Sequence, residues 1–179
     1  AYGAQPHATV IAPLAIQSVT TAAVSCFGLS DGEIAVTASG TNLSYSLDGT
    51  NWQSSNQFLN LTAANYTVYV RSQEGCVLTA TNTSISQPTQ LSVQTTPSPL
   101  TSCIAANGSV TSNVTGGTPG YTYNWTPNLG SGATISNLTA GSFALQVTDQ
   151  NGCQATSTAI VTANNTPQLT VASSSNVTC

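Results

Sequence analysis

The stretch YTVYVRSQEGC, residues 66–76, has a counterpart 77 positions later in FALQVTDQNGC, residues 143–153. In both copies an apolar side chain stands at every second position, and a polar turn with glycine and then a cysteine follow. The alternating positions are Tyr66, Val68 and Val70 in the first copy, and Phe143, Leu145 and Val147 in the second. Alternation with a period of two is typical of a strand with one buried face. The chain is therefore expected to repeat a β-rich unit.

The five cysteines follow the same period. They stand at positions 26, 76, 103, 153 and 179. A spacing of 50 residues occurs twice, and each cysteine of the first pair lies 77 residues before its counterpart. We expect tandem units at 12–88 and 89–166. Residues 1–11 are then the end of a preceding repeat or an exchanged strand, and 167–179 the first strand of a following repeat.

The simplest pairing of these cysteines is one disulfide per repeat, Cys26–Cys76 and Cys103–Cys153. Four reduced core cysteines, as in a cytosolic protein, are the alternative, and extracellular compartments favour the disulfides. Zinc is a poor alternative because there is no Cys-x2-Cys pair and His7 is the single histidine. The expected partner of Cys179 lies beyond this chain.

Uncharged polar residues dominate the composition. Thr, Ser and Asn account for 67 of the 179 residues, and charged residues for 3%, against about 25% in a typical soluble domain. Thr favours strands, and Asn and Ser favour turns. The prediction is an all-β fold of tandem immunoglobulin-like β-sandwich repeats of about 77 residues, each with about seven short strands.

The low charge also excludes classes of function. Arg71 is the only cationic Lys or Arg side chain, so there is no basic surface to neutralise a phosphate backbone, and we expect no nucleic-acid partner. No apolar run reaches the roughly 20 residues of a transmembrane helix. A surface with so little charge fits a protein within an assembly or under a glycan coat.

The segment NGSVTSNVTGGTPGYTYNWTPN followed by ATISNLTAGSFALQVTDQNGCQATSTAIVT resembles the SprB-type repeat of giant surface adhesins in gliding Bacteroidota. The other unit resembles a divergent member, with Ala64 where its neighbour has the turn glycine Gly141. The resemblance implies export to the cell surface, commonly by the type IX route, and a role in adhesion, gliding or filament building.

No catalytic constellation is expected. All five carboxylates stand at or beside predicted turns: Asp31, Glu33, Asp48, Glu74 and Asp149. Acid–base catalysis needs paired, tuned groups, and Ser/His/Asp chemistry would depend on His7. Calcium is a minority alternative, with Asp149 and Asn151 as contributors, because it needs six to eight oxygen ligands. We therefore expect no enzyme and no obligate cofactor.

The aromatic residues divide into core and contact candidates. Alternation assigns Tyr45, Tyr123, Trp125, Tyr66 and Phe143 to the core. Trp52 follows the LDGT turn, where it either packs in the core or forms an exposed contact with a sugar or a neighbouring subunit.

Ten asparagines begin Asn-x-Ser/Thr sequons and are candidate glycosylation sites. They are Asn42, Asn60, Asn65, Asn82, Asn107, Asn113, Asn124, Asn137, Asn164 and Asn176. Asn60 and Asn137 could instead be turn residues of the repeat, and sugar on Ser or Thr is a further alternative.

Two functions remain. The first is an extracellular structural and adhesive repeat protein that forms a rod or filament on the bacterial surface, with neighbouring repeats or subunits as partners. The second is a surface module that binds carbohydrate or protein through hairpin loops.

Overall fold

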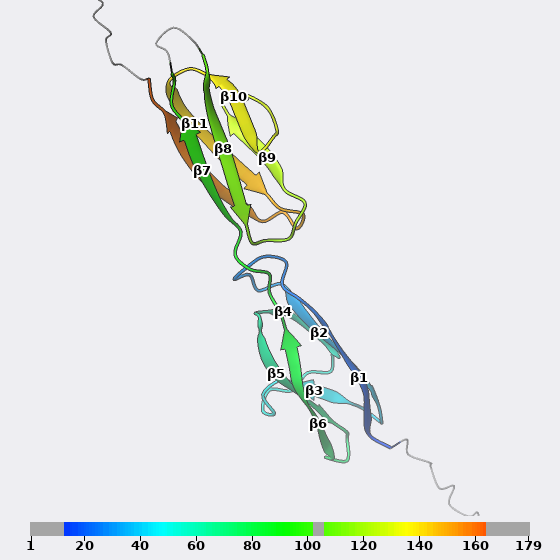
Figure 1. Cartoon of the computed structure of the whole chain (residues 1–179). Helices are drawn as coiled ribbons and strands as arrows, with labels where there is room; N and C mark the ends of the chain where they lie inside the picture. The colour runs from blue at the N-terminus through cyan, green and yellow to red at the C-terminus, as the bar shows by residue number, and fades with distance from the viewer. Residues whose placement is uncertain (1–12, 102–105, 164–179) are drawn as a thin grey trace, which may run out of the picture. The chain divides into compact units, whose positions relative to one another are not determined.

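The computed structural model describes residues 13–101 and 106–163. Every regular element in these residues is a β-strand, and the strands form four antiparallel three-stranded sheets (Figure 1). They divide into two compact units. The first comprises the described residues up to Gln90 together with 116–118 and 151–153, and the second comprises the rest.

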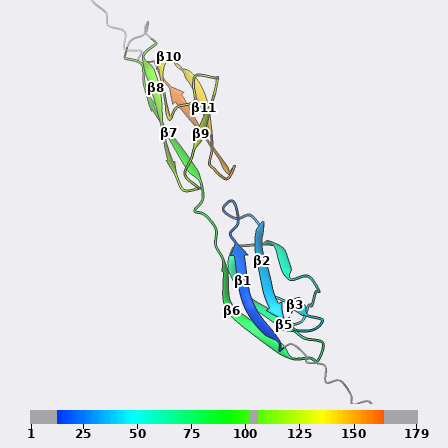
Figure 2. The same ribbon diagram turned by 90° about the vertical axis from the view of Figure 1, so that its right-hand side faces the viewer.

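The first unit packs two sheets of strand order β1-β2-β4 and β3-β5-β6. Its strands are β1 Ala15–Ala22, β2 Gly32–Ser39, β3 Ser44–Ser46, β4 Gln57–Leu61, β5 Ala64–Arg71 and β6 Val77–Ile85. Strand β1 of one sheet contacts β6 of the other, as Figure 2 shows.

The second unit repeats this arrangement with sheets β10-β8-β7 and β12-β11-β9. Its strands are β7 Ser92–Ser98, β8 Gly108–Thr115, β9 Thr122–Thr126, β10 Thr134–Leu138, β11 Gly141–Thr148 and β12 Gln154–Val161. Here β7 contacts β12, the pair equivalent to β1 and β6.

Alternation along the strands builds each core. Val68 and Val70 on β5 are fully buried, and so are Leu145 and Val147 on β11. Burying each such side chain stabilises the fold by roughly 1.5–3 kcal/mol. The predicted core aromatics behave accordingly. Tyr45, Trp125 and Phe143 are buried, and Tyr66 and Tyr123 pack against the two cores.

Matching backbone contacts show that the two units are built alike. The Val24 amide donates to the Ser86 carbonyl at 3.1 Å, and the Leu100 amide to the Thr162 carbonyl at 3.0 Å. Each bond joins the segment after the first strand to the end of the last strand. In each unit the connection between the first two strands therefore lies beside the C-terminal end of the last strand, which is β6 in the first unit and β12 in the second.

The predicted all-β fold of immunoglobulin-like sandwiches is confirmed, with six strands in each described unit rather than about seven. The unit boundary falls after Gln90, whereas the repeat limits 12–88 and 89–166 and the 77-residue length stay predictions. The predictions for 1–11 and 167–179 lie outside the described residues.

Candidate functional site

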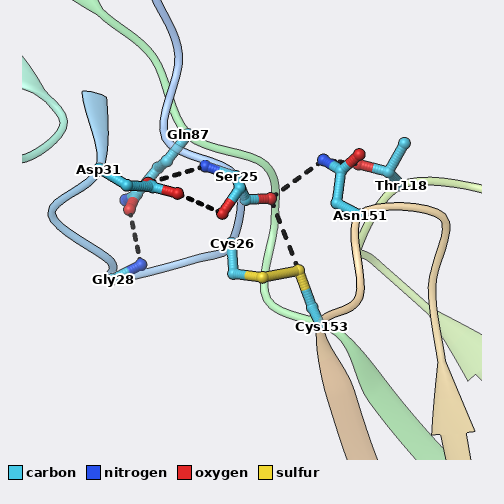
Figure 3. The surroundings of a disulfide bond; sticks show 8 residues. All are labelled: Ser25, Cys26, Gly28, Asp31, Gln87, Thr118, Asn151 and Cys153. Atoms are coloured by element: carbon cyan, nitrogen blue, oxygen red, sulfur yellow. Dashed lines mark hydrogen bonds between the residues drawn. A yellow bond between two sulfur atoms is a disulfide. The ribbon is translucent and has the colours of Figure 1, made fainter. Parts of the chain in front are cut away.

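A disulfide joins Cys26 to Cys153, with the sulfur atoms 2.04 Å apart and the cysteines 127 residues apart in sequence. Cys26 lies in the connection between β1 and β2, and Cys153 lies in the turn between β11 and β12. Figure 3 shows this disulfide with its surroundings, and the eight residues drawn all belong to the first compact unit.

Hydrogen bonds hold the loop that carries Cys26 (Figure 3). The Asp31 carboxylate accepts from the Ser25 amide at 3.0 Å and from the Ser25 hydroxyl. These bonds, with the hydroxyl the larger cause, lower the pKa of Asp31 below its ordinary value. The Gly28 amide donates to Gln87 Oε1 at 3.0 Å. Hydrogen bonds on both sides of Cys26 therefore fix the conformation of its loop.

Polar contacts from the Cys153 side meet the same loop. Asn151 Nδ2 donates to the Ser25 carbonyl and to Thr118 Oγ1, each at 3.0 Å. The Ser25 carbonyl also lies 3.5 Å from Cys153 Sγ. Ser25 directly precedes Cys26, and Asn151 stands two residues before Cys153. The hydrogen bond between Asn151 and Ser25 therefore holds the two sulfur atoms near each other.

The predicted pairing was wrong. Cys153 bonds to Cys26 instead of Cys103, and Cys76 is a free, exposed thiol. The Cys26 loop lies near the end of β6, at Ser86 and Gln87, while Cys76 immediately precedes the start of that strand. A nine-residue strand spans about 30 Å, so Cys26 and Cys76 lie at opposite ends of one sandwich and cannot bond. Cys103 and Cys179 lie outside the described residues.

A second candidate site surrounds Trp52. The Arg71 guanidinium carbon lies 4.2 Å from the centre of the Trp52 ring, within the range of a cation–π contact. Trp52 and Arg71 are each half-buried. The tryptophan is therefore neither a core residue nor a free tip, but one partner of a stacked pair.

A tightly bonded turn precedes Trp52. The Asp48 carboxylate accepts from the backbone amides of Thr50 and Asn51, both at 2.7 Å, and from Asn51 Nδ2 at 2.6 Å. The backbone bond from Asn51 is the largest cause that holds the pKa of Asp48 far below its ordinary value. After the turn, Gln53 and Tyr45 exchange backbone hydrogen bonds of 2.8 and 2.9 Å. Both flanks of Trp52 are fixed.

The remaining carboxylates also lie in or next to connections. Glu74, in the turn before Cys76, accepts from Thr41 Oγ1 at 3.1 Å. Hydrogen bonds from Ser72 first and Thr41 less lower the pKa of Glu74. Glu33 is the second residue of β2, and Asp149 is buried directly after β11.

The described residues contain no group of three or more His, Cys, Asp and Glu side chains placed to hold a metal ion. Asn151, a predicted calcium contributor, uses its amide to bond Ser25 and Thr118. His7, which serine-type catalysis would require, lies outside the described residues.

Seven of the ten sequon asparagines have described side chains, and all seven are exposed: Asn42, Asn60, Asn65, Asn107, Asn113, Asn124 and Asn137. The structure does not describe the Asn82 side chain, and Asn164 and Asn176 lie outside it. Asn60 and Asn137 both have φ of 58°, a left-handed conformation that asparagine tolerates better than most residues. These two positions have a turn role whether or not they carry sugar.

Solved structures give distant matches. A C-terminal intimin fragment, crystallised with the intimin-binding domain of its translocated receptor Tir, is 15% identical at a TM-score of 0.44, over 84% of this chain and 64% of that one. A Dscam structure is 14% identical at a TM-score of 0.37, over 85% and 47%. Fibronectin(III)-like modules of Clostridium thermocellum CbhA are 12% identical at a TM-score of 0.31, over 89% and 100%. This chain thus spans about two thirds of the length of the intimin fragment and about half of the length of the Dscam structure.

No curated protein matches the sequence. None of the described elements is a helix that could cross a bilayer. The family model of the SprB repeat matches two parts of the chain, each running from the first strand of a unit to just beyond its third strand. The matched residues are 18–47 and 95–130, and in these two parts the chain is similar to the SprB repeat.

Proposed function

We propose that this chain is an extracellular, adhesin-type repeat protein with a structural role, arranged as a rod or filament on the surface of a bacterial cell. The observation that carries the proposal is the match to the SprB repeat model, which begins at equivalent positions in the two units. The role is mechanical and adhesive rather than enzymatic.

The surface chemistry supports this proposal. Disulfides persist in oxidising compartments outside the cell, and the Cys26–Cys153 bond is one. A surface with 3% charged residues has little like-charge repulsion to keep copies apart. Such a surface favours association with further repeats of the same kind. The sequence resemblance to Bacteroidota adhesins supports export by the type IX route.

Immunolabelling of intact cells tests the location. Antibodies against the 179-residue chain should label cells that have not been permeabilised, while an antibody against a cytoplasmic protein should not. Electron microscopy with the same antibodies should show label along fibres or rods. Label that appears only after permeabilisation would overturn the proposed location, and label without elongated structures would overturn the filament.

Glycan or protein binding at the Trp52 turn is the second candidate. The rigid Asp48–Asn51 turn and the Arg71 contact fix the ring, and a fixed, half-exposed aromatic ring can stack on a sugar. The turn is specific to the first unit, because the second has NWTPN in the corresponding segment.

A glycan array with the intact chain tests this candidate. Binding should be lost with Trp52→Ala and kept with Leu129→Ala, a matched removal of an exposed apolar side chain from a loop of the other unit. An array without signal for the intact chain, or equal signal for both variants, would remove the candidate.

Glycosylation of the Asn and Ser/Thr side chains belongs to the same proposal, since it would solvate a surface with almost no charge. Seven sequon asparagines are exposed. Mass spectrometry of peptides from the native protein that contain these asparagines should show masses above those of the bare peptides. Bare masses for every peptide of this chain would contradict its glycosylation.

A further inference from the structure

We propose that the outer face of the sheet formed by β3, β5 and β6 (Figure 1) binds an acidic sugar, with the carboxylate or sulfate group on Arg71 and the sugar ring against Trp52. Such binding rests on the second candidate function, glycan binding at the Trp52 turn, and specifies the class of glycan. Its basis is a cation that has no carboxylate partner, is held on an aromatic ring, and has no equivalent in the second unit.

Strand alternation gathers large side chains on this outer face. Val70 of β5 is fully buried in the core, so its neighbours Tyr69 and Arg71 lie on the opposite face of the sheet. Arg71 pairs with Val77 of β6, which shares this face and is 47% exposed. Trp52 belongs to the same face because its ring lies 4.2 Å from the Arg71 guanidinium carbon. The face thus combines two aromatic rings, an aliphatic side chain and a cation.

The Arg71 guanidinium has no carboxylate partner among residues 13–101 and 106–163, where its side-chain contact is the Trp52 ring. Carboxylates of the two adjoining turns have other partners. Asp48 accepts from Asn51 Nδ2, and Glu74 accepts from Thr41 Oγ1. A planar guanidinium that stacks on a ring keeps the N–H groups at its edge for an anion, and their fork matches the oxygens of an acid group. The donors of Arg71 are therefore available to a ligand.

The cation is held in place before any ligand binds. Trp52, on which Arg71 stacks, directly precedes Gln53, and Gln53 exchanges backbone hydrogen bonds of 2.8 and 2.9 Å with Tyr45. A donor that is already positioned loses less side-chain freedom on binding, which favours affinity. The ring contact therefore prepares Arg71 to bind an anion.

The corresponding face of the second unit lacks these features. The positions 77 residues after the three outward residues of β5 and β6 are all uncharged and polar: Gln146, Thr148 and Gln154. Gln146 Nε2 donates to Gln154 Oε1 at 3.2 Å, so these two amides bond to each other. The strand pattern of the repeat therefore does not require an aromatic ring or a cation on this face, and their presence in the first unit indicates a separate role.

Charge and polarity favour an acidic sugar as the occupant. Arg71 is the single Lys or Arg of the chain, and one cation matches one acid group, whereas recognition of acidic peptide motifs uses clusters of arginines. Thr79, which pairs with Tyr69, is exposed on the same face, and its hydroxyl suits a sugar hydroxyl. An aromatic ring beside these polar groups provides an apolar surface for the C–H face of the sugar.

Nuclear magnetic resonance tests the proposal directly, because an isotope-labelled sample of this chain has one arginine Nε–H signal, that of Arg71. The probes are trigalacturonic acid against its methyl ester, and sulfated galactose against galactose. Short probes are needed because the net charge of -4 repels a long polyanion. We expect one or both acids to shift the Arg71 signal saturably, with binding at least about tenfold weaker for the neutral partner. The acid that shifts the signal identifies the acid group.

Matched variants separate the site from the net charge. Backbone amide signals of β5 and β6 should stop responding to the acid in Arg71→Gln, and Trp52→Ala should bind about fivefold more weakly. Arg71→Gln/Thr148→Arg restores the net charge on the corresponding face of the second unit, where no aromatic ring is available, and its arginine signal should not shift. Circular dichroism checks that each variant is folded, and the comparison of each acid with its neutral partner needs no variant.

Four outcomes would overturn the proposal. They are an equal response to an acid and its neutral partner, an equal response to acetate at the same carboxylate concentration, tighter binding of triglutamate than of either acidic sugar, and a response by the relocated arginine. If neither acid shifts the signal while neutral glycans bind an array through Trp52, the acidic-sugar proposal fails and the second candidate function stands. If no glycan binds at all, both fail.

Discussion

Cys153 is bonded across 127 residues of sequence, and the position of Arg71 allows a direct test of that bond. Trypsin has one site in this chain, after Arg71, and the fragment 1–71 contains Cys26 as its one cysteine. If the chain is denatured with its free thiols blocked and then cut, the two fragments should stay together without reductant in the parent and in Cys76→Ser. They should separate in Cys153→Ser. Separation in Cys76→Ser instead would restore the Cys26–Cys76 pairing.

Asp48 gives a prediction on pH at the same scale. Its pKa is lowered in the folded state by the hydrogen bonds from Asn51 and Thr50. A carboxylate with a lowered folded pKa stabilises the fold above its ordinary pKa of 3.8, and this contribution is lost as the pH falls toward the folded value. Melting temperature measured by circular dichroism should therefore fall below about pH 4 in the parent. Asp48→Asn should melt lower at neutral pH and show a weaker acid dependence.

Glu33→Gln is the matched control for this prediction, since Glu33 lies on β2 and outside the Asp48 turn. Its acid profile should follow that of the parent. If Asp48→Asn and the parent had parallel profiles from pH 7 to pH 2, the turn would not contribute to the acid dependence of stability.

At the scale of the strand, two glycines stand where a side chain of the facing sheet leaves no room for a Cβ. A Cβ on Gly32, at the start of β2, would lie 2.8 Å from Ile85 Cγ2 and 2.9 Å from the Leu61 carbonyl oxygen. A Cβ on Gly108, at the start of β8, would lie 2.7 Å from Val161 Cγ1. Both contacts are with buried side chains that have little room to shift. Gly32→Ala and Gly108→Ala should each lower the free energy of unfolding by roughly 1–3 kcal/mol.

Gly141→Ala is the control, because a Cβ there meets nothing closer than 3.8 Å and Ala64 fills the corresponding place in the first unit. Chemical denaturation should show it to be close to the parent in stability. Equal losses in all three variants would mean that backbone freedom, rather than the close approach, makes glycine necessary.

The strands were predictable from sequence because a two-residue period is a local property, and the buried Val68 and Leu145 confirm it. The partner of Cys26 was not predictable from sequence, because in a repeat more than one cysteine pair has a spacing that fits the period. Cys26 and Cys76 are 50 residues apart, and Cys26 and Cys153 are 127 residues apart, which is 50 plus one period of 77, so both spacings satisfy the same pattern. The direction of β6, which separates Cys26 from Cys76, decides between them. The Trp52–Arg71 contact was missed because no local motif joins them.

At the scale of the whole chain, stability comes from two similar hydrophobic cores and not from interactions between charged side chains. Each unit has its own buried core. In both units two three-stranded sheets pack together, and the first strand contacts the last. With 3% charged residues, ion pairs have little part in this design. Stability should therefore change little with ionic strength, because there are few charges to screen.

The Cys26–Cys153 disulfide acts at this same scale, because its closed loop includes most of both units. In the chain-entropy model, a loop of this length restricts the unfolded chain enough to stabilise the fold by about 5 kcal/mol. The double variant Cys26→Ser/Cys153→Ser should lose an amount of that order in urea unfolding followed by circular dichroism. Cys76→Ser should stay within about 0.5 kcal/mol of the parent, since its thiol is exposed and unbonded. A large loss in Cys76→Ser, with little in the double variant, would mean that the stabilising cross-link includes Cys76.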